Sequence, residues 1–461
     1  MTVTWTTEQV LALAPDSGSV KRGKSLAITS KWPLLGRSNI AAWGECKGSG
    51  KNPYRTQIDL SDATTPAFRC SCPSRKFPCK HSLGLFLLLA EQEQAFQANA
   101  NADHPPDWVA EWLAKRSQAA AQKQEKRQKT AADPVAQAKR AEQRASKIEA
   151  GLTDLEQWLE DIMRQGLAAL PHKPYSFWDQ TAARLVDAQA PGLAGRVRIL
   201  AGIPHSGQGW PERMLKALGK IHLLVQGYQH LESLPPLLQA EVRSQLGWSP
   251  TQAELRSRLD QSDPLVACVA DRWHVLGKHI TEEDNLKMQR VWLWGQSSQK
   301  PALVLTFAHG RQPLDVSLVP GTYFQGEMLF YPGTGVQRAF VDSRQDAQPS
   351  PSPIPEAAHG SIDQAIAHYA ECLRENPWGD RVPLMLASVI PRYEEQQWWL
   401  LDSQQTVLPL VSHYSPSWLL FALSGGHPCT VFGEWDGTAF LPLSIWTQKS
   451  NTLPLFSPLD T

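Results

Sequence analysis

The chain has 461 residues and a mass of 51.2 kDa, which is too long for one ordinary hydrophobic core and predicts about three domains. It carries 45 Lys and Arg against 45 Asp and Glu, so its formal net charge is zero. No apolar run reaches membrane-spanning length, and the start lacks a signal-peptide pattern, so we expect a soluble, cytoplasmic protein.

The charges are unevenly distributed along the chain. Residues 1–100 contain 12 Lys and Arg but 7 Asp and Glu, residues 101–150 contain 10 and 7, and the remainder contains 23 and 31. A basic front suggests an anionic partner. Attraction between the two ends of the chain, or a well-solvated linker, would also explain the asymmetry.

The first 100 residues are expected to form a small domain with a ββα unit. Residues 54–60 alternate with a period of two, and residues 66–70 again have an extended pattern, so both predict strands. The apolar run over residues 82–90 predicts a helix. We expect the strands to deliver Cys70 and Cys72, a turn to deliver Cys79, and His81 to begin the helix.

These four residues have the spacing C-x-C-x6-C-x-H, which concentrates soft metal ligands in one place. Three thiolates and one imidazole suit a single structural Zn²⁺ ion, and four protein ligands leave no position for a catalytic water. We therefore expect zinc to stabilise the fold and the chain not to be an enzyme. Cys46 is an alternative ligand, but the site is complete without it, so we interpret it as a packing residue. The remaining cysteines, Cys268, Cys372 and Cys429, are scattered singly, which argues against a disulfide framework.

The order of ligands, followed by the apolar run 82–90, resembles the SWIM zinc finger. The approach over residues 44–54 and the later run 187–194 resemble the longer bacterial SWIM zinc finger family proteins. This resemblance implies that Cys70, Cys72, Cys79 and His81 bind zinc and that the chain binds nucleic acid or protein. It also implies a link to MoxR-type AAA+ ATPases and von Willebrand A-domain proteins, and it offers no known reaction.

Several cations surround the predicted zinc ligands, with Phe68 and Phe77 between them. They are candidate contacts to nucleic acid or to a protein partner: Arg69, Arg75, Lys76 and Lys80. The alternative is that they offset the negative charge that three thiolates and a neutral imidazole leave on bound Zn²⁺.

Residues 101–150 are expected to form a basic helical linker rich in Ala, Gln and Lys, because residues 115–147 have almost no apolar face. The pattern from Thr153 to Glu156 predicts a capping box at the start of the next helix. Residues 151–262 show repeated amphipathic patterns and are expected to form a helical bundle or a stack of helix pairs.

The period changes after Pro264. Residues 263–345 are expected to form an antiparallel β domain, either a sheet or an open barrel, with strands at 273–276, 291–294, 302–307, 315–319 and 327–331. Residues 346–360 form a Pro/Ser linker by composition, and residues 361–461 are expected to mix helix and strands. The expected fold class is α+β multidomain, with a ββα zinc finger, a helical middle and a β-rich antiparallel C-terminal part.

The leading functional hypothesis is a non-enzymatic zinc-binding adaptor or scaffold that mediates protein–protein interaction through the finger. The alternative is a DNA or other nucleic-acid binding protein that uses the finger and the basic linker on phosphates. The two hypotheses differ in salt dependence, because a protein interface is far less sensitive to released counterions.

Overall fold

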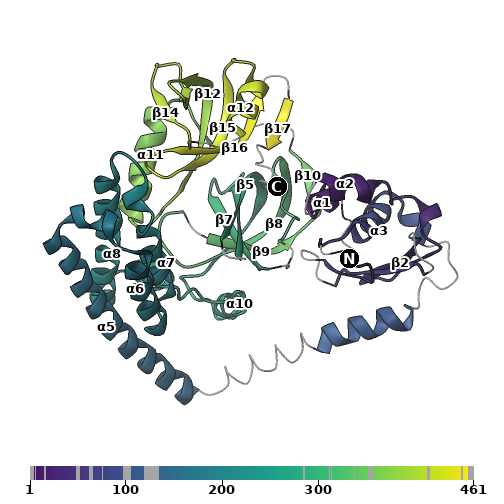
Figure 1. The fold of residues 1–461 in the computed structure, drawn as a ribbon, viewed down its shortest axis with the longest axis horizontal. Helices are drawn as coiled ribbons and strands as arrows, with labels where there is room; N and C mark the ends of the chain where they lie inside the picture. The colour runs from purple at the N-terminus through teal and green to yellow at the C-terminus, as the bar shows by residue number, and fades with distance from the viewer. Residues whose placement is uncertain are drawn as a thin grey trace.

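The computed structural model describes residues 5, 7–14, 17–47, 52–61, 66–74, 76–96, 105–118, 134–283, 286–310, 312, 314–336, 338–350, 357–412, 416–447 and 450–454. A small first domain is followed by a helical bundle, a β-barrel and a C-terminal α/β domain. The first domain and the bundle lie at opposite ends of the molecule, with the barrel between them (Figure 1). The chain has the expected α+β multidomain fold.

The first domain is built on an antiparallel four-stranded sheet in the order β1 (Leu34–Arg37), β2 (Ala41–Cys46), β3 (Tyr54–Asp59) and β4 (Ala67–Cys70). One face packs against helix α3 (Lys80–Glu91), and helices α1 (Thr7–Ala12) and α2 (Ser17–Lys24) pack against α3. The other face packs Ala41 and Trp43 against Val109, which belongs to a helix over residues 107–118. Short 3₁₀ turns, η1 (Thr29–Lys31) and η2 (Glu93–Phe96), complete the domain.

The bundle consists of α5 (Pro134–Gln165), α6 (Tyr175–Asp187), α7 (Pro191–Leu200), α8 (Trp210–Gln229) and α9 (Pro236–Leu246). The 3₁₀ turns η3 (Leu167–His172), η4 (Ile203–His205) and η5 (Leu231–Ser233) connect them, and α10 (Gln252–Asp260) follows. The helical middle is therefore as expected.

The predicted capping box is wrong, because α5 begins well before Thr153. The hydroxyl of Thr153 donates to the carbonyl of Glu149, one turn earlier in the same helix, at 2.9 Å. Thr153 therefore does not cap the helix. Ile148 and Leu152 are buried in the bundle core, so α5 already packs into the bundle before Thr153.

The next strands are β5 (Ala267–Glu283), β6 (Leu286–Gly295), β7 (Pro301–His309), β8 (Thr322–Phe330), β9 (Arg338–Arg344) and β10 (Gln348–Pro349). Because β8 pairs with both β5 and β9, and β9 also pairs with β7, strands β5 to β9 close into a barrel. The β7–β9 pair is parallel, so the expected antiparallel pattern fails there.

The predicted strand at 315–319 is also wrong. These residues form no strand, and their side chains are divided between two cores. Val316 packs into the core of the first domain, whereas Leu318 packs into the barrel. This segment therefore joins the two domains, which explains an apolar pattern that resembles a strand.

The C-terminal domain has a sheet in the order β14-β13-β12-β15-β16-β17, with β11 parallel to β12. Its elements are β11 (Ala358–His359), α11 (Ile362–Glu375), β12 (Val382–Glu394), β13 (Gln397–Leu401), β14 (Val407–Pro409), α12 (Pro416–Ser424), β15 (Cys429–Trp435), β16 (Phe440–Thr447) and β17 (Ser450–Pro454). None of the helices described is long and apolar enough to cross a membrane.

A buried ion pair joins the barrel to the C-terminal domain. The fully buried carboxylate of Glu434 accepts hydrogen bonds from Arg290 Nε and Nη2 at 2.8 and 2.9 Å, and from Trp292 Nε1 at 2.8 Å. Burial alone would raise the pKa of Glu434, but the hydrogen bonds and charge of Arg290 outweigh it, so the pKa lies below its usual value. The carboxylate is ionised and its hydrogen-bonding capacity is used, as a buried charge requires.

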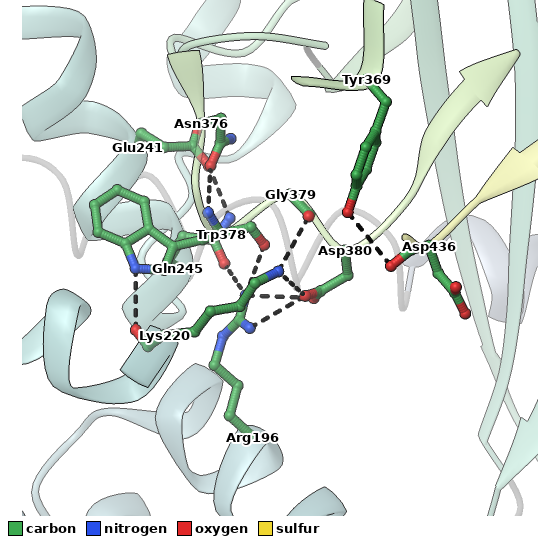
Figure 2. Close-up of polar contacts among 10 residues, drawn as sticks. All are labelled: Arg196, Lys220, Glu241, Gln245, Tyr369, Asn376, Trp378, Gly379, Asp380 and Asp436. Atoms are coloured by element: carbon green, nitrogen blue, oxygen red, sulfur yellow. Dashed lines mark hydrogen bonds and ion pairs between the residues drawn. The ribbon is translucent and has the colours of Figure 1, made fainter. Parts of the chain in front are cut away.

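A loop of the C-terminal domain also completes the bundle core. Trp378, which follows α11, is buried among the bundle residues, and its Nε1 donates to the carbonyl of Lys220 at 3.2 Å. Asp380 forms ion pairs with Arg196 at 3.4 Å and with Lys220 at 3.3 Å, beside the loop that carries the tryptophan (Figure 2). The bundle and the C-terminal domain therefore depend on each other.

Replacing Trp378 with Ala should destabilise both domains by about 3–5 kcal/mol, because it leaves a large cavity in the bundle core. The Trp418→Ala variant is the matched control, since Trp418 is 60% exposed. Urea unfolding, with hydrogen exchange of α8 as the local probe, would measure the difference. Equal behaviour of the two variants would contradict the proposed dependence.

Candidate metal centre and the adjoining cleft

The four predicted ligands lie where β4 ends and α3 begins. Cys70 is the last residue of β4, and Cys72 follows outside the strand, so the expectation that a strand delivers Cys72 was wrong. Cys79 is the N-cap of α3, and its sulfur accepts a hydrogen bond from the backbone amide of Ser82. His81 lies in the first turn of the helix. The local fold thus brings together four ligands, two before and two after the short connection between β4 and α3.

The ligand atoms of Cys70, Cys72, Cys79 and His81 all lie within 4.8 Å of one another. His81 Nδ1 is 3.8 Å from the sulfur of Cys70 and 3.9 Å from that of Cys79. A tetrahedral zinc ion separates a sulfur from a nitrogen ligand by about 3.5–3.6 Å and two sulfur ligands by about 3.8 Å, given the usual bond lengths, so the two distances from His81 Nδ1 lie within a few tenths of an ångström, roughly, of the first value. The donor set and its spacing therefore fit zinc, with Nδ1 as the histidine ligand.

Neighbouring side chains orient these ligands. Thr56 Oγ1 lies 3.3 Å from the sulfur of Cys70, and Ser82 Oγ lies 3.4 Å from that of Cys79. The ring of Tyr54 packs on the imidazole of His81 with 4.7 Å between centroids. Such outer contacts fix ligand orientation and support metal affinity.

The thiols of the cluster interact strongly with one another. The hydrogen bond from Cys70 lowers the pKa of Cys79, helped by His81 and Ser82, and the same contact raises the pKa of Cys70. Burial raises the pKa of Cys72. Zinc must therefore displace protons from Cys70 and Cys72, so its affinity falls as the pH falls.

Cys46 is close to this centre but does not join it. Its side chain is completely buried in the core of the first domain, and its sulfur lies 3.7 Å from the backbone carbonyl of Lys47. Burial raises the pKa of Cys46 to about 11, so its thiol is protonated. It is absent from the cluster of ligand atoms, in agreement with a packing role.

A second group of metal-binding residue types lies where β11 meets α11. Cys372 Sγ is 3.6 Å from His368 Nε2, and the ring of His359 lies 5.1 Å from that of His368. Among the described residues, only the Cys70 cluster brings three or more such ligand atoms together, so these three residues do not form a second metal-binding cluster. Burial, with Glu375 and Glu371 nearby, raises the pKa of Cys372 to about 11, so the thiol is not activated.

Comparison with known families agrees with this assignment. Residues 54–90 match the SWIM zinc finger, and residues 143–246 match the SWIM-associated four-helix bundle domain. The resemblance inferred from the ligand spacing is therefore confirmed, and it extends to the bundle. Comparisons with curated proteins and with solved structures gave no match.

A cleft of about 1080 Å³ adjoins the metal centre. His81 and Cys72 contribute to its wall, together with five cationic side chains: Arg22, Lys31, Lys47, Lys76 and Lys80. Among the described residues that line the cleft, none is acidic. This cleft, defined by these five cations, is called the basic cleft below.

The basic cleft forms because α2 crosses α3 at two glycines. A Cβ atom on Gly23 would lie 3.0 Å from that of Leu83, and one on Gly84 would lie 2.7 Å from that of Leu26. This close approach places Arg22 beside the finger. The backbone amide of Lys47 donates to the carbonyl of Lys31 at 2.9 Å, which brings these two residues together at the same edge.

Two of the four predicted basic contacts, Lys76 and Lys80, line the cleft. Arg69 is exposed on β4 and is not among the lining residues, and Arg75 lies outside the described residues. Sequence reasoning missed Arg22, Lys31 and Lys47, since they lie in segments without a metal motif. The basic run at residues 21–24 was the available signal.

The Cys79→Ala variant should lose zinc and local structure of α3, whereas the Cys46→Ala variant should keep a zinc-to-protein ratio of about one. Metal analysis and hydrogen exchange of α3 would test both. In the unmodified protein, zinc should be released as the pH falls from neutral toward 5, because protons compete for the thiolates. Equal zinc loss from both variants would show that Cys46 is a ligand.

Proposed function

We propose that this chain is a non-enzymatic nucleic-acid binding protein in which one structural zinc ion holds the finger against a phosphate-binding cleft. The basic cleft carries the proposal, since five cationic side chains line it beside the metal centre and none of its described lining residues is acidic. Convergent Lys and Arg side chains are the usual means of binding phosphate. The leading hypothesis from sequence was a protein adaptor, and the cleft favours the alternative.

The number of cations argues against a purely structural role for them. Three thiolates, a neutral imidazole and Zn²⁺ leave a single negative charge, which one or two nearby cations would offset. Within the part of the chain that the structure describes, no ion pair involves four of the five cations of the cleft: Arg22, Lys31, Lys47 and Lys80. The five side chains are exposed, so each is accessible to a phosphate from solvent.

Zinc has an indirect role in this proposal. The connection from Cys72 to Cys79 has neither helix nor strand where it is described, and it carries Lys76. The four ligands fix both ends of this connection and also fix the start of α3, where Lys80 lies. Removing the metal should therefore displace Lys76 and Lys80 from the wall of the cleft. The number of cationic side chains would stay the same.

Protein binding is the second candidate. The C-terminal domain exposes a cluster of aromatic rings, in which Trp418 lies 5.4 Å from Tyr393 and 4.9 Å from Trp398. Trp418 is 60% exposed and Tyr393 45% exposed, which is typical of interaction surfaces. An adaptor role, with a MoxR-type AAA+ ATPase or a von Willebrand A-domain protein as partner, would use such a surface.

Binding of the full-length, zinc-loaded protein to nucleic acid should depend strongly on salt. Five phosphate contacts predict a slope of log K against log salt between about −3.5 for a single strand and about −4.5 for a duplex. Affinity should thus fall at least 100-fold, roughly, from 50 to 200 mM salt. Fluorescence anisotropy would measure the slope, and a slope near zero would contradict the proposal.

The double variant Arg22→Gln, Lys47→Gln should reduce the magnitude of this slope by about 2 and weaken binding to every sequence tested. The matched control is Lys21→Gln, Lys24→Gln, which removes the same charge from neighbouring exposed positions that do not line the cleft. A similar loss in both variants would indicate a general charge effect, and the cleft would not be the binding site.

A pull-down from native lysate separates the two candidate functions. Intact protein and the Cys79→Ala, His81→Ala variant would be compared with and without nuclease, and bound zinc, protein and nucleic acid quantified together. The intact protein should bind nucleic acid, or proteins that nuclease releases, and the variant should no longer bind this material. A nuclease-resistant set of proteins that is lost with the variant would instead support the adaptor.

A further inference from the structure

We propose that a cavity between the barrel and the C-terminal domain binds a small aromatic carboxylate, with its ring among aromatic side chains and its carboxylate at a pair of histidines. This site shares no described lining residue with the basic cleft and goes beyond the proposed function. The size of the cavity, its walls and its hydrogen-bond donors each support this class of ligand.

The size and place of the cavity indicate a small ligand. Its volume is about 180 Å³, and it lies where the C-terminal domain meets the barrel (Figure 1). One wall comes from β5, β6 and β7, and the other comes from β11, α11, β12 and β15. An apolar cavity of about 150 Å³ accepts benzene, so this one has room for a ring with one small substituent. Interfaces between domains are common places for such sites.

Fixed aromatic rings line the interior of the cavity. They belong to Trp292, Trp294 and Phe432. Trp292 and Phe432 are only 1% and 2% exposed, and Trp292 is held by its hydrogen bond to Glu434. Leu276 and Met385 add apolar surface. Because flat rings pack closely against other rings, these walls favour an aromatic ligand over a flexible chain.

Two imidazoles mark the polar end of the cavity. The rings of His359, on β11, and His368, on α11, lie 5.1 Å apart, and both residues line the cavity. His368 is exposed and His359 is partly buried, so the pair lies at the mouth. An imidazole always carries at least one N–H donor, and its charge changes readily near neutral pH. Among the described lining residues there is no Asp or Glu to accept from the pair, so an anionic ligand fits this end.

Trp294 adds a donor without a partner. Its Nε1 is buried, and within the described part of the chain it forms no hydrogen bond. A buried donor that stays unpaired costs free energy, which a hydrogen bond to a ligand oxygen would recover. With the two histidines, this indole makes the cavity rich in donors. A carboxylate, which accepts several hydrogen bonds, is therefore the group that matches the cavity best.

Benzoate is the probe, because it combines a single ring with a carboxylate. Isothermal titration calorimetry of the full-length, zinc-loaded protein at neutral pH would compare it with benzyl alcohol, which lacks the charge, and with acetate, which lacks the ring. Benzoate should bind at a single site, at least about tenfold more tightly than either compound. Absence of saturable benzoate binding, or equal binding of benzyl alcohol or acetate, would overturn the proposal.

Two variants test the location of the site. Ala358→Leu places a larger side chain at the cavity and His368→Leu removes an imidazole, so each should weaken benzoate binding by about tenfold or more. The matched control is His427→Leu, since His427 is an exposed histidine of the same domain that does not line the cavity. Thermal unfolding identifies a variant that no longer folds. Because His368 is exposed, its variant should fold, and its result decides. Unchanged affinity in His368→Leu, or an equal loss in His427→Leu, would contradict the proposed site.

Discussion

Four ligand atoms that must meet at one metal ion impose the main constraint on the first domain. Cys70 is anchored by its pairing in β4, and Cys79 and His81 are anchored at the start of α3, so zinc ties the sheet to the helix. Structural zinc contributes on the order of 10–16 kcal/mol to small modules, which is comparable to the whole stability of a domain. Few other interactions in a connection this short could hold its two ends together.

The basic cleft is a consequence of that constraint and of packing around it. Zinc fixes the finger side of the cleft, while the close contact of Gly23 and Gly84 with α3 and α2 fixes the opposite side. The remaining domains are joined by different means: Val316 connects the first domain to the barrel, Glu434 connects the barrel to the C-terminal domain, and Trp378 connects that domain to the bundle. The finger is thus held on a continuous series of packed domains.

The sequence predicted those features that are local in the chain. The metal centre was predictable because all four ligands lie within twelve residues, in two closely spaced pairs of soft metal ligands. The helical middle and the strand-rich rear followed from periodicity. The cleft was not predictable, because Arg22 comes to line it beside Lys80 through the crossing of α2 with α3, and Lys47 through its backbone contact with Lys31. Barrel closure through β9 and the burial of Trp378 in the helical bundle also depend on tertiary contacts. The segment around Val316 has a strand-like apolar pattern because Val316 packs into the core of the first domain and not because it forms a strand.

The central claim is that the metal organises the phosphate-binding cleft, and one comparison tests it most directly. The slope of log affinity against log salt for a single strand would be measured with the same protein in its zinc-loaded form and after removal of zinc by a chelator. The account predicts that the zinc-free protein loses most of its affinity and that its slope becomes shallower, since Lys76 and Lys80 no longer face the other cations. Equal affinity and equal slope in the two forms would contradict it, because the charges alone, without the metal-held geometry, would then explain binding.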